Sequence, residues 1–248
     1  MTAILKNALR FDAMTVKKAL RALKTAFPFT LPILAGFLFL GISYGILART
    51  SGLPAWLPIL TSTVIFGGSL EFVGITILTA PFAPVQAFIM GLMVQARHLF
   101  YGLSMLDKYK GAKASKPYLI FGLCDETFSI NCSAVPKEGV DRNLFMLFVT
   151  ALNQLYWVVG ATLGSLVGSV FTFNTEGLDF AMTAMFTVIL LEQLLKEKSH
   201  ISSSIGLLST VLCLLVFGKD SFLIPSMIVI LTLLLLFKKP IEQGGDIE

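Results

Sequence analysis

One apolar stretch, residues 82–106, constrains the fold of this chain more than any other. At 25 residues it is long enough to cross the hydrocarbon core of a bilayer with some tilt. It is apolar except for Gln95, Arg97 and His98, near its C-terminal third. An arginine near the bilayer centre costs roughly 2.5–3.5 kcal/mol on insertion scales. Arg97 and His98 therefore either reach the membrane interface, or face a polar cavity and meet a carboxylate there. The carboxylates that lie in other apolar segments are Glu71, Asp125 and Glu126.

The composition indicates an all-α polytopic membrane protein. Of the 248 residues, 55% are hydrophobic and only 14% are charged, against about 25% charged in a soluble domain. The net charge of +4 comes from basic flanks, so it reports on membrane orientation and does not indicate nucleic-acid binding. No cofactor or metal is expected, because the three cysteines are scattered through apolar segments without metal-ligand spacing; they are Cys124, Cys132 and Cys213.

The charge distribution divides the chain into three parts. Residues 1–24 are basic and carry leucine and valine at roughly helical spacing, which predicts an amphipathic helix on the anionic cytoplasmic leaflet. By the positive-inside rule this places the N-terminus in the cytoplasm. Residues 25–239 are expected to form a single transmembrane transport domain, and residues 240–248 a polar C-terminal tail.

The apolar run 54–80 is interrupted by poor helix formers. Gly67, Gly68 and Ser69 lie at its centre and Glu71 follows, so this run is either a plain helix with a tight glycine contact or a helix that breaks here. A break at membrane depth is tolerated where the free backbone groups line a cavity or pack inside protein. Residues 117–134 form a shorter and more polar segment, in which the adjacent Asp125 and Glu126 point about 100° apart if helical.

The uncharged run 143–175 carries three glycines at strict four-residue spacing, Gly160, Gly164 and Gly168. This pattern predicts a helix-packing ridge, directed either toward another helix of the chain or toward a partner. Asn153 and Gln154 precede the ridge, and we expect them to make interhelical hydrogen bonds.

The segment count leaves two topologies open. If eight apolar segments all cross the membrane, the lysine-bearing loop 107–116 falls on the outer side, against the positive-inside rule. If segments 54–80 and 117–134 are re-entrant, six crossings remain and the loop lies inside. Segment starts near 28, 55 and 82 recur near 117, 143 and 178, which predicts a three-segment internal repeat with inverted copies and discontinuous helices.

Three motifs resemble the AzlC family, the large subunit of branched-chain amino acid exporters. They are Phe66-Gly67-Gly68-Ser69-Leu70-Glu71-Phe72, then Gln95-Ala96-Arg97-His98-Leu99-Phe100-Tyr101-Gly102, and finally Asp125-Glu126-Thr127-Phe128. The chain departs from the family pattern at Glu71, where glutamine is expected, and at Gln95, where asparagine is expected. The resemblance implies export of valine, leucine, isoleucine and related compounds such as methionine across the bacterial inner membrane. It also implies proton coupling and a small hydrophobic AzlD-type partner subunit.

The residues and the resemblance together predict a substrate site and a proton site. Glu71, Asp125 and Glu126 are the candidates for proton coupling, because desolvation favours the neutral form of a carboxyl group. Apolar walls are expected from Phe66, Phe72, Phe128 and Ile130. A passive channel is the alternative within transport, and an intramembrane enzyme is the alternative of another class; only His98 and His200 are available as histidines, and no nucleophile elbow or zinc-protease motif is present. The predicted substrate-binding residues are Gly67, Gly68, Ser69, Glu71, Gln95, Arg97, His98 and Asn131.

Overall fold

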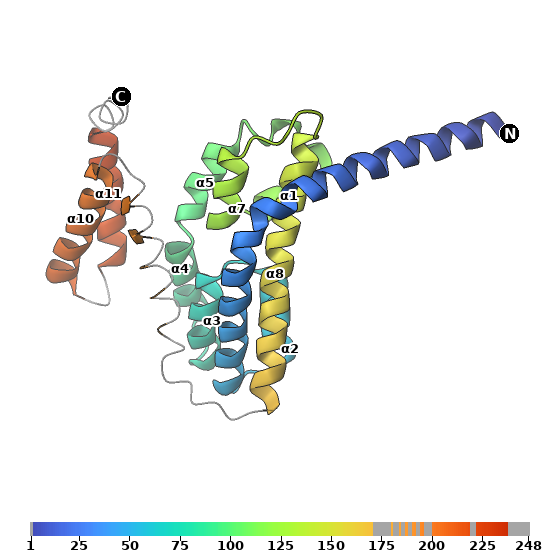
Figure 1. The fold of residues 1–248 in the computed structure, drawn as a ribbon. Coiled ribbons are helices and arrows are strands. Elements are labelled where there is room, and N and C mark those ends of the chain that lie inside the picture. The colour runs from blue at the N-terminus through green and yellow to red at the C-terminus, as the bar shows by residue number, and fades with distance from the viewer. Residues whose placement is uncertain are drawn as a thin grey trace. The chain divides into compact units, whose positions relative to one another are not determined.

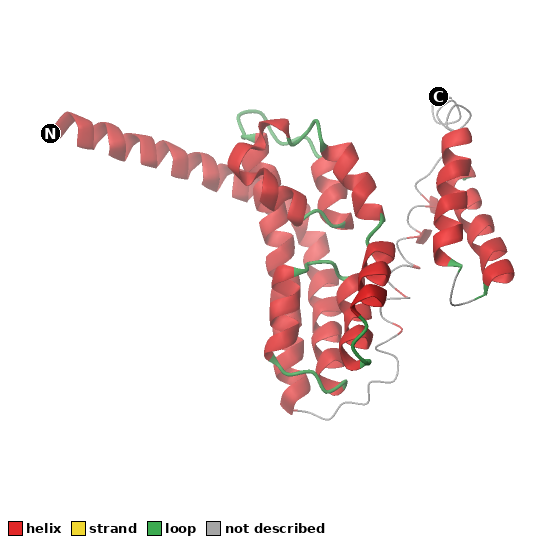
Figure 2. Cartoon of the chain, turned by 180° about the vertical axis from the view of Figure 1, so that it is seen from behind, coloured by secondary structure: helices red, strands yellow, loops and turns green. Residues whose placement is uncertain are grey.

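The computed structural model describes residues 2–170, 200–218 and 222–237, with some helical residues between 180 and 195. The regular elements among these residues are all helical, as the sequence predicts (Figure 2). The chain divides into two compact units, residues 1–181 and 182–248. The sequence alone suggested one transport domain over residues 25–239, and that boundary stays a prediction.

Two long helices, α1 (Thr2–Thr50) and α8 (Arg142–Val170), form the spine of the first unit (Figure 1). Within the described residues, Val16–Thr50 and Arg142–Ser169 are the two stretches long and apolar enough to cross a membrane. The helices run parallel, because Phe29 packs edge-on against Phe145 near one end and Gly168 lies against Arg49 at the other. Helix α1 continues without a break past residue 24, where the sequence predicts the end of an interfacial helix.

The glycine ridge of α8 lies against α1 of the same chain. A Cβ atom added to Gly164 would lie 2.1 Å from the backbone oxygen of Ile42. On the facing helix, a Cβ on Gly45 would lie 2.3 Å from the backbone oxygen of Ala161. Only glycine permits such a close approach of two backbones. The sequence left open whether the ridge contacts another helix of the chain or a partner. In the structure it contacts α1 of the same chain, so it is not free to receive a partner helix.

Three of the predicted apolar segments consist of two short helices each. Run 54–80 breaks between Val64 and Ser69, with positive φ angles of 45° at Phe66 and 36° at Gly68. Run 82–106 is also interrupted, at Gln95–Ala96, so the expectation of one continuous span here is wrong. The helices are α2 (Trp56–Val64) and α3 (Ser69–Thr79), α4 (Pro84–Val94) and α5 (Arg97–Met105), and α6 (Lys116–Phe121) and α7 (Asp125–Ser133), with a 3₁₀ helix at Lys110–Ser115 before α6.

Helices α2 and α3 form a re-entrant hairpin. The start of α2 lies near the C-terminal end of α8, where Ser165 Oγ donates to the carbonyl oxygen of Ala55 over 2.8 Å. The turn reaches the middle of α1, where Phe66 packs against Phe37. Helix α3 then runs back, because Phe72 packs against Tyr44, further along α1.

Helices α6 and α7 form a second hairpin, which enters from the opposite end. Before α6 begins, Gly111 accepts a 2.9 Å hydrogen bond from Asn143 Nδ2 at the start of α8. At the middle of α8, Asn153 Nδ2 donates to Thr127 Oγ1 over 3.1 Å. The lysine-bearing loop 107–116 therefore lies at the same end as the N-terminal part of α1, where Ala26 packs with Tyr109 and Ala112. Each of these two segments therefore enters and leaves at the same end of the first unit, as a re-entrant segment would, and the number of membrane crossings stays a prediction.

The predicted repeat register has no counterpart in the structure, because it pairs the continuous helix from residue 28 with the interrupted segment at 117. A different correspondence is visible. Each re-entrant hairpin is followed by a crossing segment, and the hairpin turns read Phe66-Gly67-Gly68-Ser69-Leu70-Glu71 and Phe121-Gly122-Leu123-Cys124-Asp125-Glu126. Gly67 lies against the side chain of Gln95, and Gly122 lies against the side chain of Thr150. Gly122 follows Gly67 by 55 residues, and Thr150 follows Gln95 by the same number.

The second unit contains α10 (Ile201–Phe217) and α11 (Leu223–Leu236), which pack against each other. Neither helix contains a charged residue, in keeping with the apolar composition of this part of the chain. The predicted tail 240–248 lies outside the described residues, as do Lys196, Lys198, Lys238 and Lys239.

Candidate functional site

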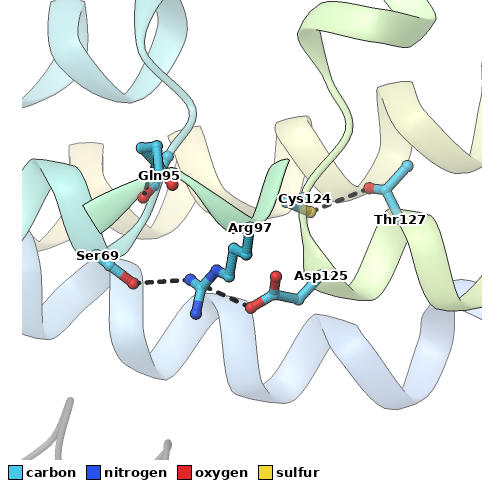
Figure 3. Close-up of polar contacts among 7 residues, drawn as sticks. Ser69, Gln95, Arg97, Cys124, Asp125 and Thr127 are labelled. Atoms are coloured by element: carbon cyan, nitrogen blue, oxygen red, sulfur yellow. Dashed lines mark hydrogen bonds and ion pairs between the residues drawn. The ribbon is translucent and has the colours of Figure 1, made fainter. Parts of the chain in front are cut away.

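The breaks of the three interrupted segments meet at Arg97. This residue opens α5, and its Nη2 atom lies 3.1 Å from the Ser69 hydroxyl, on the first residue of α3. The same nitrogen forms an ion pair with Asp125 Oδ2 at 3.2 Å, on the first residue of α7. Figure 3 shows the guanidinium between the two hairpins. Each half-helix therefore presents its N-terminal residue to one shared centre, which we call the Arg97 centre (Arg97, Ser69 and Asp125).

The Arg97 centre is only partly shielded from solvent. The side chains of Arg97 and Asp125 keep 34% and 24% of their exposure. The prediction that Arg97 meets a polar partner inside the domain is confirmed, with Asp125 as the carboxylate. A partly exposed pair retains some hydration, so the pair can open at a lower cost than a fully buried one.

Gln95 stabilises the break in the first hairpin. Its Nε2 atom donates to the carbonyl oxygen of Gly67 over 3.0 Å. A Cβ on Gly67 would lie 2.1 Å from that nitrogen, so glycine is required for this contact. The bond satisfies a backbone oxygen that the interrupted helix leaves free.

Glu71 lies one turn into α3 and is almost fully buried, with 1% exposure. Its Oε2 atom accepts a 2.7 Å hydrogen bond from Trp157 Nε1 of α8. Its Oε1 atom has no hydrogen-bond partner among the described residues. The indole ring stacks on Tyr44, with ring centroids 6.3 Å apart. The carboxyl group is therefore enclosed by aromatic rings, with the Trp157 indole as its side-chain donor and the backbone N–H groups of Gly67 and Gly68 close by.

Sequence reasoning missed Trp157. The signal that could have found it is an indole in the middle of a long uncharged run, because a buried Trp N–H usually requires an acceptor. Only the contact between α3 and α8 identifies that acceptor as Glu71.

A small cavity is lined by Leu70 and His98, the sequence neighbours of Ser69 and Arg97, although no residue of the Arg97 centre itself is in its wall. Its volume is about 260 Å³, and its polar side chains are Gln95 and His98. The remaining walls are mainly apolar and come from all three interrupted segments. The volume falls below the range of about 300–1,000 Å³ that is typical of drug-sized ligands. The apolar lining residues are Ile65, Phe66, Leu70, Ile120, Phe121 and Leu123, with Gly102 also in the wall.

Three of the four predicted wall residues lie elsewhere. Phe66 lines the cavity, but Phe72 is buried against Tyr44. Phe128 stacks on Tyr101, with ring centroids 4.5 Å apart, and Ile130 packs against the core beside α5 and α8. The sequence placed them by proximity to motifs, whereas the direction of each helix decides which face meets the cavity.

Two predicted polar residues also lie away from the cavity. Asn131 is buried and donates to the Tyr109 hydroxyl over 3.3 Å, so it belongs to the packed end of α7. Glu126 is half-buried in the first turn of α7 and does not line the cavity. Asn153 and Gln154 make the predicted interhelical hydrogen bonds, with Gln154 Nε2 donating to the Thr63 carbonyl oxygen over 3.0 Å. Among the described residues, no group of three His, Cys, Asp or Glu side chains is arranged to hold a metal ion.

Comparison with known proteins gives the family of this chain. The family model described as AzlC protein matches residues 32–171. The branched-chain amino acid transport protein AzlC of Bacillus subtilis is 54% identical over 223 residues, which cover 90% of this chain and 88% of the relative. An uncharacterized membrane protein of Haemophilus influenzae is 46% identical, covering 84% of this chain and 85% of the relative.

A more distant relative is the inner membrane protein YgaZ of Escherichia coli, 23% identical over 68% of this chain and 72% of its own length. No solved structure matches this chain. The helical architecture, the three interrupted segments and the family match lead to one conclusion: this chain is a membrane protein of the AzlC family.

Proposed function

We propose that this chain is the large subunit of a secondary transporter that exports branched-chain amino acids across the bacterial inner membrane. The substrates are valine, leucine and isoleucine, with methionine and related analogues also accepted. Protons enter in exchange, and a small AzlD-type subunit completes the transporter. The observation that carries this proposal is the Arg97 centre, where hairpins from opposite ends meet beside a small apolar cavity. The name of the Bacillus subtilis relative supports the substrate class.

The cavity suits a branched aliphatic side chain. Its walls are mainly aliphatic and aromatic, and its polar groups are Gln95, in the break after α4, and His98, in the first turn of α5. Such a pocket discriminates weakly between aliphatic amino acids, because one methylene group changes the binding free energy by only about 1–3 kcal/mol. Overlapping acceptance of the four amino acids follows from this small difference.

The substrate carboxylate binds at the Arg97 centre in this proposal. It replaces the carboxylate of Asp125 on the guanidinium, an exchange of one ion pair for another. The N-terminus of α3, which begins at Ser69, directs the positive end of its helix dipole toward the same anion. Because Arg97 touches both hairpins, this exchange loosens one hairpin from the other and allows the cavity to open toward one side at a time.

Glu71 carries the coupling proton in this proposal. Asp125 is already engaged in an ion pair with Arg97, whereas Glu71 has Trp157 as its side-chain hydrogen-bond donor and lies in aromatic surroundings. Glu71 is two residues from Ser69, so a change of protonation there acts on the hairpin that Arg97 holds. Glu126 is the second candidate because it occupies the corresponding position in the other hairpin turn.

Transport by proteoliposomes tests the proposal. Vesicles that contain the chain, with or without the AzlD-type subunit, are loaded with radiolabelled valine and given an inward proton gradient. We expect saturable efflux that needs both subunits, shows counterflow with leucine and stops when a protonophore is added. Efflux linear in valine concentration and without counterflow would identify a channel. Absence of efflux for all four amino acids would reject the substrate class.

A further inference from the structure

We propose that a basic groove between α1 and the loop 134–141 binds the phosphate headgroup of an anionic membrane phospholipid. The groove has a volume of about 740 Å³. Its lining holds five basic side chains and no acidic one. Four of them lie on α1 and one on the loop: Lys17, Lys18, Arg21, Lys24 and Lys137.

The groove is built by two segments that are far apart in the sequence. Lys17, Arg21 and Lys24 recur at helical spacing and so share one face of α1. Across from them, Gly139 has a φ angle of +78° and no side chain, and a Cβ there would lie 3.3 Å from Nη1 of Arg21. The loop backbone therefore approaches the guanidinium closely, and Lys137 closes the groove from the loop side.

The charge of the groove favours an anion with several acceptor oxygens. Within the described part of the chain, none of the five basic side chains forms an ion pair or a side-chain hydrogen bond. Like charges this close repel each other unless an anion lies between them. A phosphodiester offers oxygens to several lysine and arginine donors at once.

Apolar side chains beside the groove favour a lipid over free phosphate. Leu20 and Phe29 line the groove and are exposed, and Phe27 and Val135 are exposed next to it. A membrane phospholipid supplies a phosphate for the cations and acyl chains for these side chains, as in other basic pockets at the cytoplasmic surface. Since the loop 134–141 joins α7 to α8, a bound lipid would tie α1 to the base of the second hairpin.

Lipid titration of the full chain tests this inference without any transport measurement. The protein in a neutral detergent is titrated with phosphatidylglycerol or phosphatidylcholine, and bound lipid is measured by native mass spectrometry. We expect a preference for phosphatidylglycerol and a higher melting temperature when it is bound. The triple variant K17Q/R21Q/K24Q should lose at least about tenfold in phosphatidylglycerol affinity, given about 1 kcal/mol for each basic residue near an anionic surface.

Two matched variants separate the groove from general positive charge. K110Q/K113Q/K116Q removes three charges from the lysine-bearing loop, outside the groove lining, and should change the affinity less than twofold. Lys137→Gln changes one exposed loop residue and should weaken binding about three- to fivefold. If the two triple variants lose equal affinity for phosphatidylglycerol, or if Lys137→Gln has no effect on it, the groove is not the binding site. Displacement of the lipid by glycerol phosphate at millimolar concentration would instead indicate a free phosphate ligand, and equal affinity for phosphatidylcholine would exclude an anion site.

Discussion

At the scale of single residues, Glu71 and Arg97 have opposite environments although the breaks of their two segments meet at one centre. Glu71 is enclosed by aromatic rings and has Trp157 as its hydrogen-bond donor. Arg97 keeps a third of its side-chain exposure and contacts two other helix starts. These two environments are the ones that the proposed roles of a proton carrier and a permanent cation require, respectively.

Replacing Glu71 by glutamine should uncouple transport without unfolding the protein. The glutamine carbonyl oxygen can still accept the hydrogen bond from Trp157, and glutamine is the residue of the family pattern at this position. We expect proton-driven efflux to fall at least about tenfold, while valine–leucine counterflow stays within twofold of the wild type. Glu138→Gln, on the exposed loop after α7, serves as the control. If Glu71→Gln keeps full proton-driven efflux, the proton site lies elsewhere, with Glu126 as the next residue to test.

A double-mutant cycle on Arg97 and Asp125 should measure their coupling. The pair is partly exposed, so we expect about 1–2 kcal/mol, below the 3–5 kcal/mol of a fully buried pair and above most surface pairs. Unfolding of Arg97→Ala, Asp125→Ala and the double variant in mixed micelles gives the value. The cycle on Lys110 and Asp107, an ion pair with 76% and 86% exposure, is the control and should show no measurable coupling. Equal coupling for both pairs would contradict a structural role for the Arg97 centre.

At the scale of elements, glycines determine how closely a hairpin turn approaches its neighbouring segment. Gly67 faces the end of a flexible side chain, Gln95, which can move. Gly122 faces Cγ2 of Thr150, and a Cβ there would lie only 2.2 Å from that methyl group. A β-branched side chain on a helix has one or two permitted rotamers, so Thr150 cannot withdraw. The two turns are therefore similar in sequence, but only the first can accommodate a side chain larger than glycine by moving its neighbour.

Gly122→Ala should destabilise the protein, and Thr150→Ser should restore most of the loss. Overpacking of this kind costs typically about 1–3 kcal/mol. Serine lacks the methyl group that the new Cβ would meet and keeps the hydroxyl that bonds to the Met146 carbonyl oxygen. Melting temperatures of the single and double variants give the result. Gly74→Ala, where a Cβ meets nothing within 4 Å, is the matched control and should not lower the melting temperature. A loss in Gly122→Ala that Thr150→Ser does not restore would exclude this contact as its cause.

At the scale of the whole molecule, two hairpins from opposite ends place their turns at mid-depth between α1 and α8. Free backbone groups at that depth are tolerated because they pack inside protein or line a cavity. The same arrangement puts the lysines of loop 107–116 beside the basic N-terminal part of α1, at one end of the first unit. This distribution favours a cytoplasmic location for that end.

Cysteine labelling should reveal the re-entrant topology. In a background without Cys124, Cys132 and Cys213, we expect Lys113→Cys to react only with reagent on the cytoplasmic side. Ser51→Cys and Ala83→Cys should both react from the outside, because α2 and α3 return to the end from which they entered. All three positions are exposed. If every segment crossed, Ala83→Cys would react from the cytoplasm and Lys113→Cys from the outside.

The sequence by itself determined the class of protein and the family, and it located the first helix break as one of two alternatives. Long uncharged runs leave few folds other than membrane helices, and paired glycines before Ser69 disfavour a helix wherever they occur. The interhelical role of Asn153 and Gln154 also followed from residue type and setting. Each of these conclusions depends on local chemistry, which the order of residues contains.

The tertiary structure alone decided which groups meet. The partner of Arg97, the acceptor of Trp157, the break at Gln95–Ala96 and the occupant of the α8 glycine ridge all depend on the neighbour that a helix faces. The periodicity of apolar residues defines a helix face but does not identify the element that packs against it. In a bilayer the lipid is as apolar as the helices, so close packing of small residues and interhelical hydrogen bonds select the neighbours, and both require the backbones to be placed in three dimensions.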